Sequence, residues 1–423
     1  MKKSNRKGFT IVELVIVIAV IAILAAVLIP TFASIIKKAN LSSDQSAVRN
    51  MNTALAAETE VLTIDDATRI LSEAGYNADK TLVPVTKGHS FYWYETYNTI
   101  LLIDDTDGKF ELVYPTNNED IVANYKDDKA LLHNLAFSRS KTEVKSNEIA
   151  DVLKAGNNVS LTEEIKVTDA KKVTVSGKSV KTNIVVPAGE SVNIDLNNNK
   201  VSAADGIYAM AIGGNAYIDN GTISSRGLYI CPGATVTLGK NVKVEANGTD
   251  GGSAIRNYGG VVIINGGEYS VLDAKDLAEV TPSTIAYQPS ALYCDGGYVE
   301  INGGKFIGND TKAYVVNINN ASVVINNCEV TSGRGAISLI NCAAEINGGN
   351  FTNDYNGSAY TLYYSASNLT ASLKITGGTF TNKNTGSDAY EAYISYTSDI
   401  AANINIDSSV LVKANGNYYN SAK

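Results

Sequence analysis

The segment "EINGGKF", residues 300–306, is one copy of a motif that recurs through the second half of the chain. Related copies read "YIDNGTI" (217–223), "IINGGEY" (263–269), "VINNCEV" (324–330), "EINGGNF" (345–351) and "KITGGTF" (374–380). Each copy has an apolar residue, then Asn, Asp or Thr, two turn residues, one variable residue and a second apolar residue. Asn and Gly favour tight turns, so the copies predict many short strands joined by such turns.

The first apolar residue of each copy, which we call the anchor, recurs at irregular intervals of 20 to 37 residues. The anchors are Leu196, Ile218, Leu238, Ile264, Ile301, Ile325, Ile346, Ile375 and Ile406. These intervals are too irregular for helical-hairpin repeats and favour a parallel β-helix whose loops vary in length. Each turn of such a coil lies one strand spacing, about 4.8 Å, above the previous one, so equivalent residues form ladders. We expect a right-handed coil, because crossovers between parallel strands are overwhelmingly right-handed.

Two segments modify this coil. "SNEIADVLKAG" (146–156) has apolar residues at helical spacing and ends in Gly156, which predicts a short helix that caps the open end of the coil. The longest insertion, near Ser270 to Pro289, separates the anchors Ile264 and Ile301 and is the first place to look for a functional loop.

The residues that follow the anchors form a polar column, which could be a metal ladder or a turn ladder. They are Asn197, Asp219, Gly239, Asn265, Asn302, Asn326, Asn347, Thr376 and Asp407. The turn ladder is favoured because Asn and Asp tolerate left-handed backbone and stacked amides hydrogen-bond along the axis. The calcium-binding pattern GGxGxD is absent, so we expect no metal and no cofactor. Glu268, Lys305 and Glu329 share another column and form a solvated charge ladder.

The four cysteines do not suggest a disulfide framework. Cys231 and Cys294 both lie seven residues before an anchor, two strand spacings or about 9.6 Å apart. This exceeds the ~7 Å that a disulfide tolerates between Cα atoms. Cys328 and Cys342 occupy different columns, and we expect them to be buried thiols.

The N-terminus is a different kind of sequence, beginning with "RKGFTIVELV" (6–15). Phe9 to Ile29 is apolar apart from Thr10 and Glu13, and as a helix rising ~1.5 Å per residue it spans the ~30 Å core of a bilayer. The basic residues Lys2, Lys3, Arg6 and Lys7 precede it. This flank keeps that end cytoplasmic, so we expect the bulk of the chain to be extracellular.

Glu13 distinguishes three interpretations of this apolar segment. A cleaved secretory signal would end at an A-x-A-like site, but Thr31 occupies the −3 position of Pro30-Thr31-Phe32-Ala33 and the run is long. A plain membrane anchor leaves Glu13 unexplained, because a carboxylate within an apolar helix is costly unless it is paired.

The third interpretation explains Glu13, because "KGFTIVEL" resembles the N-terminus of type IV pilins and pseudopilins, over about Met1 to Leu62. The resemblance implies that a prepilin peptidase cuts after Gly8 and methylates Phe9, and that Pro30 kinks the helix. It makes Glu13 the fifth residue of the mature chain. There its carboxylate can neutralise the terminal ammonium of a neighbouring subunit, an assembly role.

The predicted organisation is therefore α+β followed by all-β. It comprises a leader (1–8), a pilin helix (9–62) with a transmembrane part (9–29), a small pilin-like head (63–140) and a parallel β-helix (141–423). The helical stripe continues through Val48, Met51, Leu55 and Leu62. In the head we expect a helix at 66–74, strands at 81–85 and 90–96, and a hairpin turning at Asp107-Gly108.

The shape of the coil resembles that of pectin lyases and polygalacturonases, which is the main argument for an enzyme. Both histidines, His89 and His133, precede the repeats, and Arg226 and Arg334 open rungs that lie four apart. Glu300 and Glu345 form an outward pair at about 9.6 Å, close to the ~6.5–9.5 Å of inverting glycosidases. Two carboxylates align in this way by chance often enough that we assign no catalytic residue.

The tyrosines of "SAYTLYYS" (358–365) and "DAYEAYISY" (388–396) either stack on sugars or protein surfaces, or fill and cover the coil. The net charge of −8 argues against nucleic acid as a partner. We therefore expect a non-enzymatic bacterial pilus subunit, held in the membrane before assembly, with an extracellular β-helix for adhesion to a glycan or host surface. Its expected partners are prepilin peptidase and other pilins. The alternatives are a membrane-tethered polysaccharide lyase or hydrolase and a pseudopilin of a secretion or DNA-uptake system.

Overall fold

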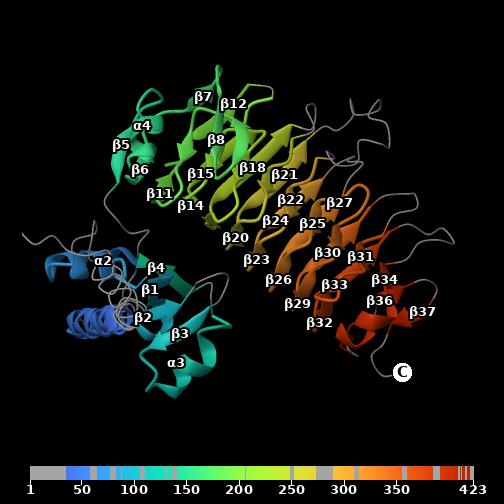
Figure 1. Ribbon diagram of the computed structural model, residues 1–423, viewed down its shortest axis with the longest axis horizontal. Helices are drawn as coiled ribbons and strands as arrows, with labels where there is room; N and C mark the ends of the chain where they lie inside the picture. Colours follow the sequence, from blue (N-terminus) through green and yellow to red (C-terminus); the bar gives the residue numbers. More distant parts are fainter. Residues whose placement is uncertain are drawn as a thin grey trace, which may run out of the picture. The chain divides into compact units, whose positions relative to one another are not determined.

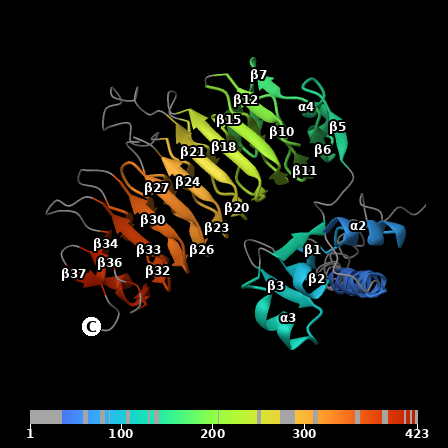
Figure 2. The same ribbon diagram turned by 180° about the vertical axis from the view of Figure 1, so that it is seen from behind.

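The computed structural model divides the chain into two compact units, Met1–Ala136 and Phe137–Lys423 (Figures 1 and 2). We call them the first and second units. The structure describes residues 35–57, 64–76, 82–86, 88–104, 110–128, 131–135, 141–204, 206–247, 252–272, 289–308, 314–354, 360–383, 391–407, 410, 412–414 and 417–419.

The first unit combines helices with one antiparallel sheet in the strand order β3-β2-β1-β4. Residues 35–55 are helical. The other elements are α2 (Ile64–Glu73), β1 (His89–Tyr94), η1 (Glu95–Tyr97), β2 (Thr99–Asp104), β3 (Glu111–Tyr114), α3 (Glu119–Asn124) and β4 (Leu132–Asn134). The predicted helix at 66–74 and strand at 90–96 are confirmed, with ends shifted by one or two residues. The two strands that flank the predicted hairpin turn also pair with each other, as β2 and β3. The hairpin tip at Asp107-Gly108 lies outside the described residues.

The predicted strand at 81–85 is wrong, because the described residues 82–86 form bends rather than a strand. Pro84 lacks the backbone N–H that a paired strand needs. The segment is instead held by Asp44 on the helix, whose carboxylate accepts hydrogen bonds from the backbone N–H groups of Val85 (2.7 Å) and Thr86 (2.9 Å).

The helix over residues 35–55 packs on the sheet as its apolar stripe predicts. Val48, Met51 and Leu55 are fully buried in one cluster with Trp93 and Leu102 of the sheet. Leu62, the last residue of the predicted stripe, lies outside the described residues. The helix therefore supplies the core of the first unit.

The second unit contains three parallel sheets, which we number 1 to 3. Sheet 1 consists of β10 (Val185–Val186), β13 (Met210–Ile212), β16 (Leu228–Ile230), β19 (Ile255–Asn257), β22 (Leu292–Asp295), β25 (Val316–Asn319), β28 (Ile337–Ile340), β31 (Leu362–Ala366), β34 (Ala392–Tyr396), β36 (Val412–Ala414) and the antiparallel β37 (Asn417–Tyr419). Sheet 2 consists of β5 (Thr142–Val144), β6 (Val159–Leu161), β11 (Ser191–Asp195), β14 (Asn215–Asp219), β17 (Thr235–Leu238), β20 (Val261–Ile264), β23 (Tyr298–Ile301), β26 (Ser322–Ile325), β29 (Ala343–Ile346), β32 (Ser372–Ile375) and β35 (Ile404–Ile406). Sheet 3 consists of β7 (Ile165–Val167), β12 (Lys200–Ala203), β15 (Gly221–Ser225), β18 (Val242–Asn247), β21 (Glu268–Leu272), β24 (Lys305–Gly308), β27 (Glu329–Ser332), β30 (Asn350–Asn353) and β33 (Thr379–Asn382).

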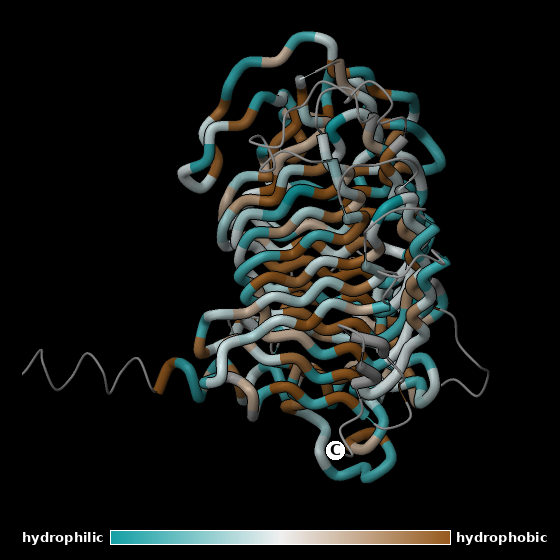
Figure 3. Tube along the Cα trace, turned by 90° about the vertical axis from the view of Figure 1, so that its right-hand side faces the viewer, coloured by the Kyte–Doolittle hydropathy of each residue, from teal (hydrophilic) through white to brown (hydrophobic). Residues whose placement is uncertain are grey.

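The chain visits the three sheets in turn, so each circuit adds one strand to each sheet, as β13, β14 and β15 do. These parallel-strand sheets are consistent with a β-helix. Alternate residues of each strand point inward and stack on their counterparts in the next circuit, and Figure 3 shows the resulting rows of apolar residues. The ladders expected from the repeats are therefore present.

Eight of the nine anchors are confirmed, because Ile218, Leu238, Ile264, Ile301, Ile325, Ile346, Ile375 and Ile406 are register partners in successive strands of sheet 2. The prediction that Leu196 is an anchor and Asn197 the column residue after it is wrong. The register partner of Ile218 is Ile194, and that of Asp219 is Asp195. Asn197 and Asn198 have positive φ angles of 47° and 61°, so this turn is longer than the others and shifts the pattern by two residues.

The helix α4 (Ile149–Lys154) closes the N-terminal end of the coil, as predicted. Gly156, with a φ of 73°, follows this helix. Ile149 and Leu153 are buried in the same apolar cluster as the strands of the coil. A hairpin, β8 (Lys172–Val175) and β9 (Lys178–Lys181), and the 3-10 helix η8 (Ser398–Asn403) complete the unit.

Candidate functional site

The polar column that follows the anchors is a hydrogen-bonded ladder along sheet 2. Asn302 donates to Asn265 (3.1 Å), Asn326 to Asn302 (2.7 Å), Asn347 to Asn326 (3.0 Å) and Thr376 to Asn347 (2.7 Å). Each amide oxygen accepts from the circuit that follows it. The prediction of stacked amides at the turns is confirmed.

We expect Asn326→Ala to lower the free energy of unfolding by about 1–3 kcal/mol, because it breaks two bonds and leaves a carbonyl of Asn302 and an amide of Asn347 without this partner. Urea unfolding followed by circular dichroism measures the change. The matched control is Asn327→Ala, because Asn327 is adjacent, exposed and outside the ladder. Equal losses in both variants would contradict the ladder's role.

Asp219, the acidic residue that precedes the amides in the column, is held by other contacts. Asp219 accepts hydrogen bonds from the backbone N–H groups of Asn220 and Asn241 (2.8 Å each) and from the hydroxyl of Tyr217 (3.0 Å). A Cβ atom on Gly239 would lie 2.1 Å from the Asp219 carboxyl carbon, so glycine leaves room for this carboxylate. In the described part of the chain, no group of three or more His, Cys, Asp or Glu residues could hold a metal ion.

Glu300 and Glu345 lie on the outer face of sheet 2 with Val324 between them, so the register that the sequence predicted is correct. Glu300 is only 4% exposed and accepts hydrogen bonds from the hydroxyl of Tyr298 (2.7 Å) and the amide of Asn302 (3.0 Å). Glu345 forms an ion pair with Lys374 at 2.7 Å. Each carboxylate thus has its own partners, which supports a structural role.

The remaining candidates for chemistry are dispersed or buried. His89 lies in β1 and His133 in β4, where its Nε2 atom is 3.1 Å from a carboxylate oxygen of Glu95. Arg226 lies two residues before β16 and Arg334 three residues before β28, and these strands are four apart in sheet 1, as predicted. No catalytic set forms from these residues.

The four cysteines are free and buried. This confirms that Cys231 and Cys294 form no disulfide and that Cys328 and Cys342 are buried thiols. Burial raises the pKa of the Cys231 and Cys342 thiols to about 11 and that of the Cys294 and Cys328 thiols to about 12. The expectation that Cys231 and Cys294 share a column is wrong, because Cys294 aligns through Asn257 with Ile230. The connections from sheet 1 to sheet 2 differ in length. Residues at the same distance before two anchors therefore need not be register partners in sheet 1.

The charge ladder on sheet 3 is present as predicted. Glu268, Lys305 and Glu329 are register partners in β21, β24 and β27, and Lys305 and Glu329 are exposed. Lys243 extends the ladder through an ion pair with Glu268 at 3.1 Å. Such exposed pairs contribute little to stability.

The connections from sheet 3 to sheet 1 vary most in length. They range from two residues, between Ser225 and Leu228, to 19 residues, between Leu272 and Leu292. Those from sheet 2 to sheet 3 contain only one to four residues. The insertion near Ser270 to Pro289 belongs to this variable corner, and its residues 273–288 lie outside the described part of the chain.

Two groups of tyrosines lie on the outer face of sheet 1. The first consists of Tyr314, Tyr360, Tyr363 and Tyr393. Tyr363 and Tyr393 stack with ring centroids 5.2 Å apart, and all four side chains are half-buried. Their neighbour Tyr364 is fully buried inside the coil. The tyrosine-rich segments therefore supply both rings that fill the coil and rings that cover its outside.

The second group, missed by the sequence analysis, combines Tyr208, Tyr229, Tyr258 and Tyr293 with three cations. The cations are Lys178, Arg226 and Arg256, and each lies over a ring at 5.3–5.6 Å from its centroid. Together with the β8–β9 hairpin, these residues form what we call the basic tyrosine patch. Its members are up to 121 residues apart, from Lys172 to Tyr293, so only the fold brings them together.

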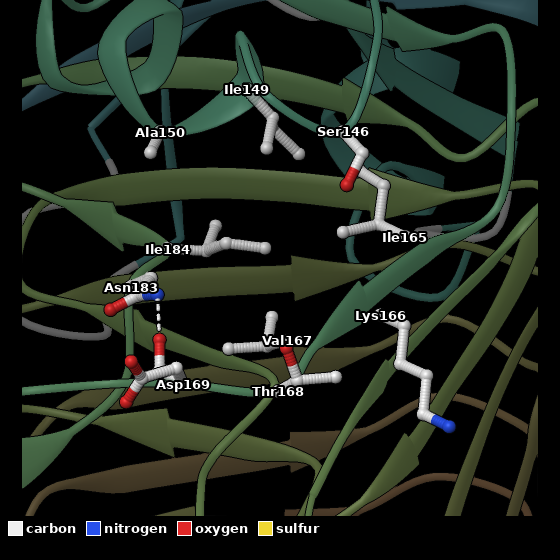
Figure 4. Close-up of a pocket in the computed structure, with 10 residues that line it drawn as sticks. All are labelled: Ser146, Ile149, Ala150, Ile165, Lys166, Val167, Thr168, Asp169, Asn183 and Ile184. Carbon is white, nitrogen blue, oxygen red and sulfur yellow. Dashed lines mark hydrogen bonds between the residues drawn. The ribbon is translucent and has the colours of Figure 1, made fainter.

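A small pocket lies where α4 meets the first circuits of the coil (Figure 4). Ile149, Ile165 and Ile184 line it with apolar surface. The amide of Asn183 donates a hydrogen bond to the backbone carbonyl of Asp169 at its edge. The lining offers no pair of groups suited to acid–base or nucleophilic chemistry.

The N-terminal site residues Gly8, Phe9, Glu13 and Pro30 lie outside the described residues, as does the apolar segment Phe9–Ile29. None of the helices within the described ranges has the length and apolar character needed to cross a membrane.

Comparison with known proteins places a motif on this N-terminus. Residues 3–29 match the family described as "Prokaryotic N-terminal methylation motif", a stretch that includes Gly8, Phe9 and Glu13. A type IV major fimbrial protein FimA of Dichelobacter nodosus is 47% identical over 53 residues, which are 12% of this chain and 34% of FimA. The type IV wide pilus major component PilA4 of Thermus thermophilus is 67% identical over 36 residues, which are 8% of this chain and 28% of PilA4.

These similarities confirm a prepilin-type motif and a relationship to type IV pilins at the N-terminus. The chain spans about a third of the length of the curated relatives it matches. No solved structure matches the chain.

Proposed function

We propose that this protein is a type IV pilin-like subunit that displays its second unit on the cell surface for adhesion or surface recognition. The methylation motif over residues 3–29 carries the proposal. In it, Phe9–Ile29 is the membrane helix before assembly, prepilin peptidase cuts after Gly8, and Phe9 becomes the methylated first residue. Other pilin subunits are then its partners through residues 9–62.

The proposed role of Glu13 follows from the cost of burying charge. In a filament of packed apolar helices, the ammonium of Phe9 and the carboxylate of Glu13 on neighbouring subunits lose their water together. Such a buried pair is tolerated when both partners are present, and removing one partner costs about 3–5 kcal/mol. The pair thus favours subunits that are both cut and correctly placed.

We propose that the second unit is a right-handed parallel β-helix, and its regular addition of one strand to each of three sheets supports this fold. Such a scaffold suits recognition, because it holds exposed side chains on rigid strands and varies its loops at one corner. The partners found for Glu300 and Glu345 favour a binding unit over a tethered lyase or hydrolase.

The test uses filaments sheared from cells that express the full chain with a C-terminal epitope. We expect the epitope in the sheared filament fraction, and we expect these filaments to be retained by a polysaccharide array without releasing sugars. The control filaments come from cells that lack the gene. Release of sugars that is lost in Glu300→Gln or Glu345→Gln would instead establish a tethered enzyme, and an epitope confined to the cell membrane would contradict the subunit role.

A further inference from the structure

The β8–β9 hairpin is the most basic short segment of the described chain. Residues 171–181, "KKVTVSGKSVK", contain four lysines and no acidic residue. Lys171, Lys172 and Lys181 are exposed, and Lys178 is half-buried. This concentration contrasts with a chain whose net charge is −8.

The hairpin is fixed on the outer face of sheet 1 by its apolar side. Val175 and Val180 are buried in one cluster with Ala211, Tyr229 and Cys231. Because side chains alternate along a strand, this packing directs Lys172 and Lys181 away from the sheet, whereas Lys178 lies on the same side as Val180 and over the ring of Tyr258. The hairpin therefore holds its lysines on a rigid surface beside the tyrosines.

Arg256 lies at the centre of the patch. It is the register partner of Tyr229 on one side and Tyr293 on the other, and it is only 6% exposed. Its Nη1 atom donates a hydrogen bond to the hydroxyl of Tyr208 at 3.1 Å, and its guanidinium carbon lies 5.6 Å from the ring centroid of Tyr293. Burial acts to lower the pKa of Arg256, but the surrounding tyrosines raise it, and the net shift is upward. Arg256 thus remains a cation.

Arg226 and Lys178 continue the same arrangement. The Arg226 guanidinium carbon lies 5.6 Å from the ring centroid of Tyr208, and the Lys178 ammonium lies 5.3 Å from that of Tyr258. The tyrosines come from four consecutive circuits, so the patch extends over three strand spacings, about 14 Å. It is long enough for several units of a linear polymer.

We propose that the basic tyrosine patch binds a carboxylated polysaccharide, with Arg226 and the hairpin lysines facing carboxylates and the half-buried Tyr258 and Tyr293 contacting the sugar rings. The buried Tyr208, Tyr229 and Arg256 support this surface from beneath. This inference rests on the proposed recognition function and names its ligand class. Arginine offers paired donors to a carboxylate, and tyrosine offers an apolar ring face with a hydroxyl donor. Six cations, Lys171, Lys172, Lys178, Lys181, Arg226 and Arg256, supply the complementary charge.

A polysaccharide fits this surface better than a nucleic acid. Duplex DNA carries one charge per ~1.7 Å, and its affinity depends on many cationic contacts. Because the chain has a net charge of −8, its surface outside the patch repels such a dense polyanion. A glycan with one carboxylate per sugar places fewer charges over the same length and leaves ring surfaces for the tyrosines.

The experiment measures binding of the full chain, in sheared filaments or purified in detergent, to immobilised polymers. The probes are alginate, carboxyl-reduced alginate, heparin and duplex DNA. We expect alginate to bind at least tenfold more tightly than its carboxyl-reduced form. Binding should weaken as salt rises from about 0.1 to 1 M, where the Debye length falls from ~10 to ~3 Å.

Lys172→Gln combined with Lys181→Gln changes only exposed residues and should weaken alginate binding about tenfold, for two contacts of up to ~1 kcal/mol each. Arg226→Lys retains the charge of a half-buried residue but loses the paired donors and should weaken binding as well. The matched control, Lys305→Gln, removes an exposed lysine from sheet 3 and should leave binding unchanged.

Each outcome decides one question. Heparin binding through the same lysines would extend the ligand to sulfated glycans, whereas preferential binding of DNA or equal binding of carboxyl-reduced alginate would overturn the inference. Filaments that contain the chain but do not bind alginate would overturn this inference alone. A purified chain that binds alginate but never enters filaments would overturn the proposed subunit role alone.

Discussion

Glu13→Ala should remove the protein from surface filaments while its leader is still cut. In the proposed filament, the substitution leaves the ammonium of Phe9 without a carboxylate partner, at a cost of about 3–5 kcal/mol. Because each 1.4 kcal/mol is a factor of ten in an equilibrium constant, incorporation should fall more than a hundredfold. Quantitative immunoblots of sheared filaments and of membranes, with the mass of the N-terminal peptide, measure both steps.

The matched control for Glu13→Ala is Glu73→Ala, which removes an exposed carboxylate in α2 that pairs with Arg69. Surface ion pairs of this kind contribute little, so this variant should assemble normally. If Glu13→Ala is found in filaments in the same amount as the control, Glu13 has no assembly role.

Phe351→Ala should destabilise the second unit by about 3–5 kcal/mol, the usual cost of truncating a buried phenylalanine. Phe351 is 1% exposed and stacks on Phe380 with ring centroids 4.8 Å apart at 9°. It belongs to an inward column in which Tyr269, Phe306, Val330, Phe351 and Phe380 are successive register partners. Its loss therefore opens a cavity that the neighbouring circuits cannot close.

Urea unfolding followed by circular dichroism measures this loss. The control is Leu369→Ala, since Leu369 is 69% exposed and should contribute little. A loss below about 1 kcal/mol for Phe351→Ala, similar to that of the control, would show that the column does not stabilise the coil.

The repeats predicted the fold well because register in a stacked coil repeats with every circuit. An apolar anchor followed by Asn and Gly specifies both an inward residue and a turn, and eight of nine anchors are register partners. The failure at Leu196 arose where two asparagines with positive φ lengthen the turn. In the first unit, the strand predicted at 81–85 does not form because Pro84 removes a backbone donor.

The basic tyrosine patch could not be predicted in the same way. Arg256 and Tyr229 are register partners. The connection between β18 and β19 is longer than that between β15 and β16, so the spacing of the repeats does not show that these two residues align. The hairpin also folds onto sheet 1 rather than joining a ladder. The lysine-rich segment 171–181 was the one signal present in the sequence.

The most direct test of the pilin-like subunit is mass spectrometry of the N-terminal peptide from the protein recovered in sheared surface filaments. We expect a chain that begins at Phe9 with one methyl group on its amine, and no such peptide in a Gly8→Val variant. A filament protein that retains Met1 to Gly8, or that begins after Ala33, would contradict it.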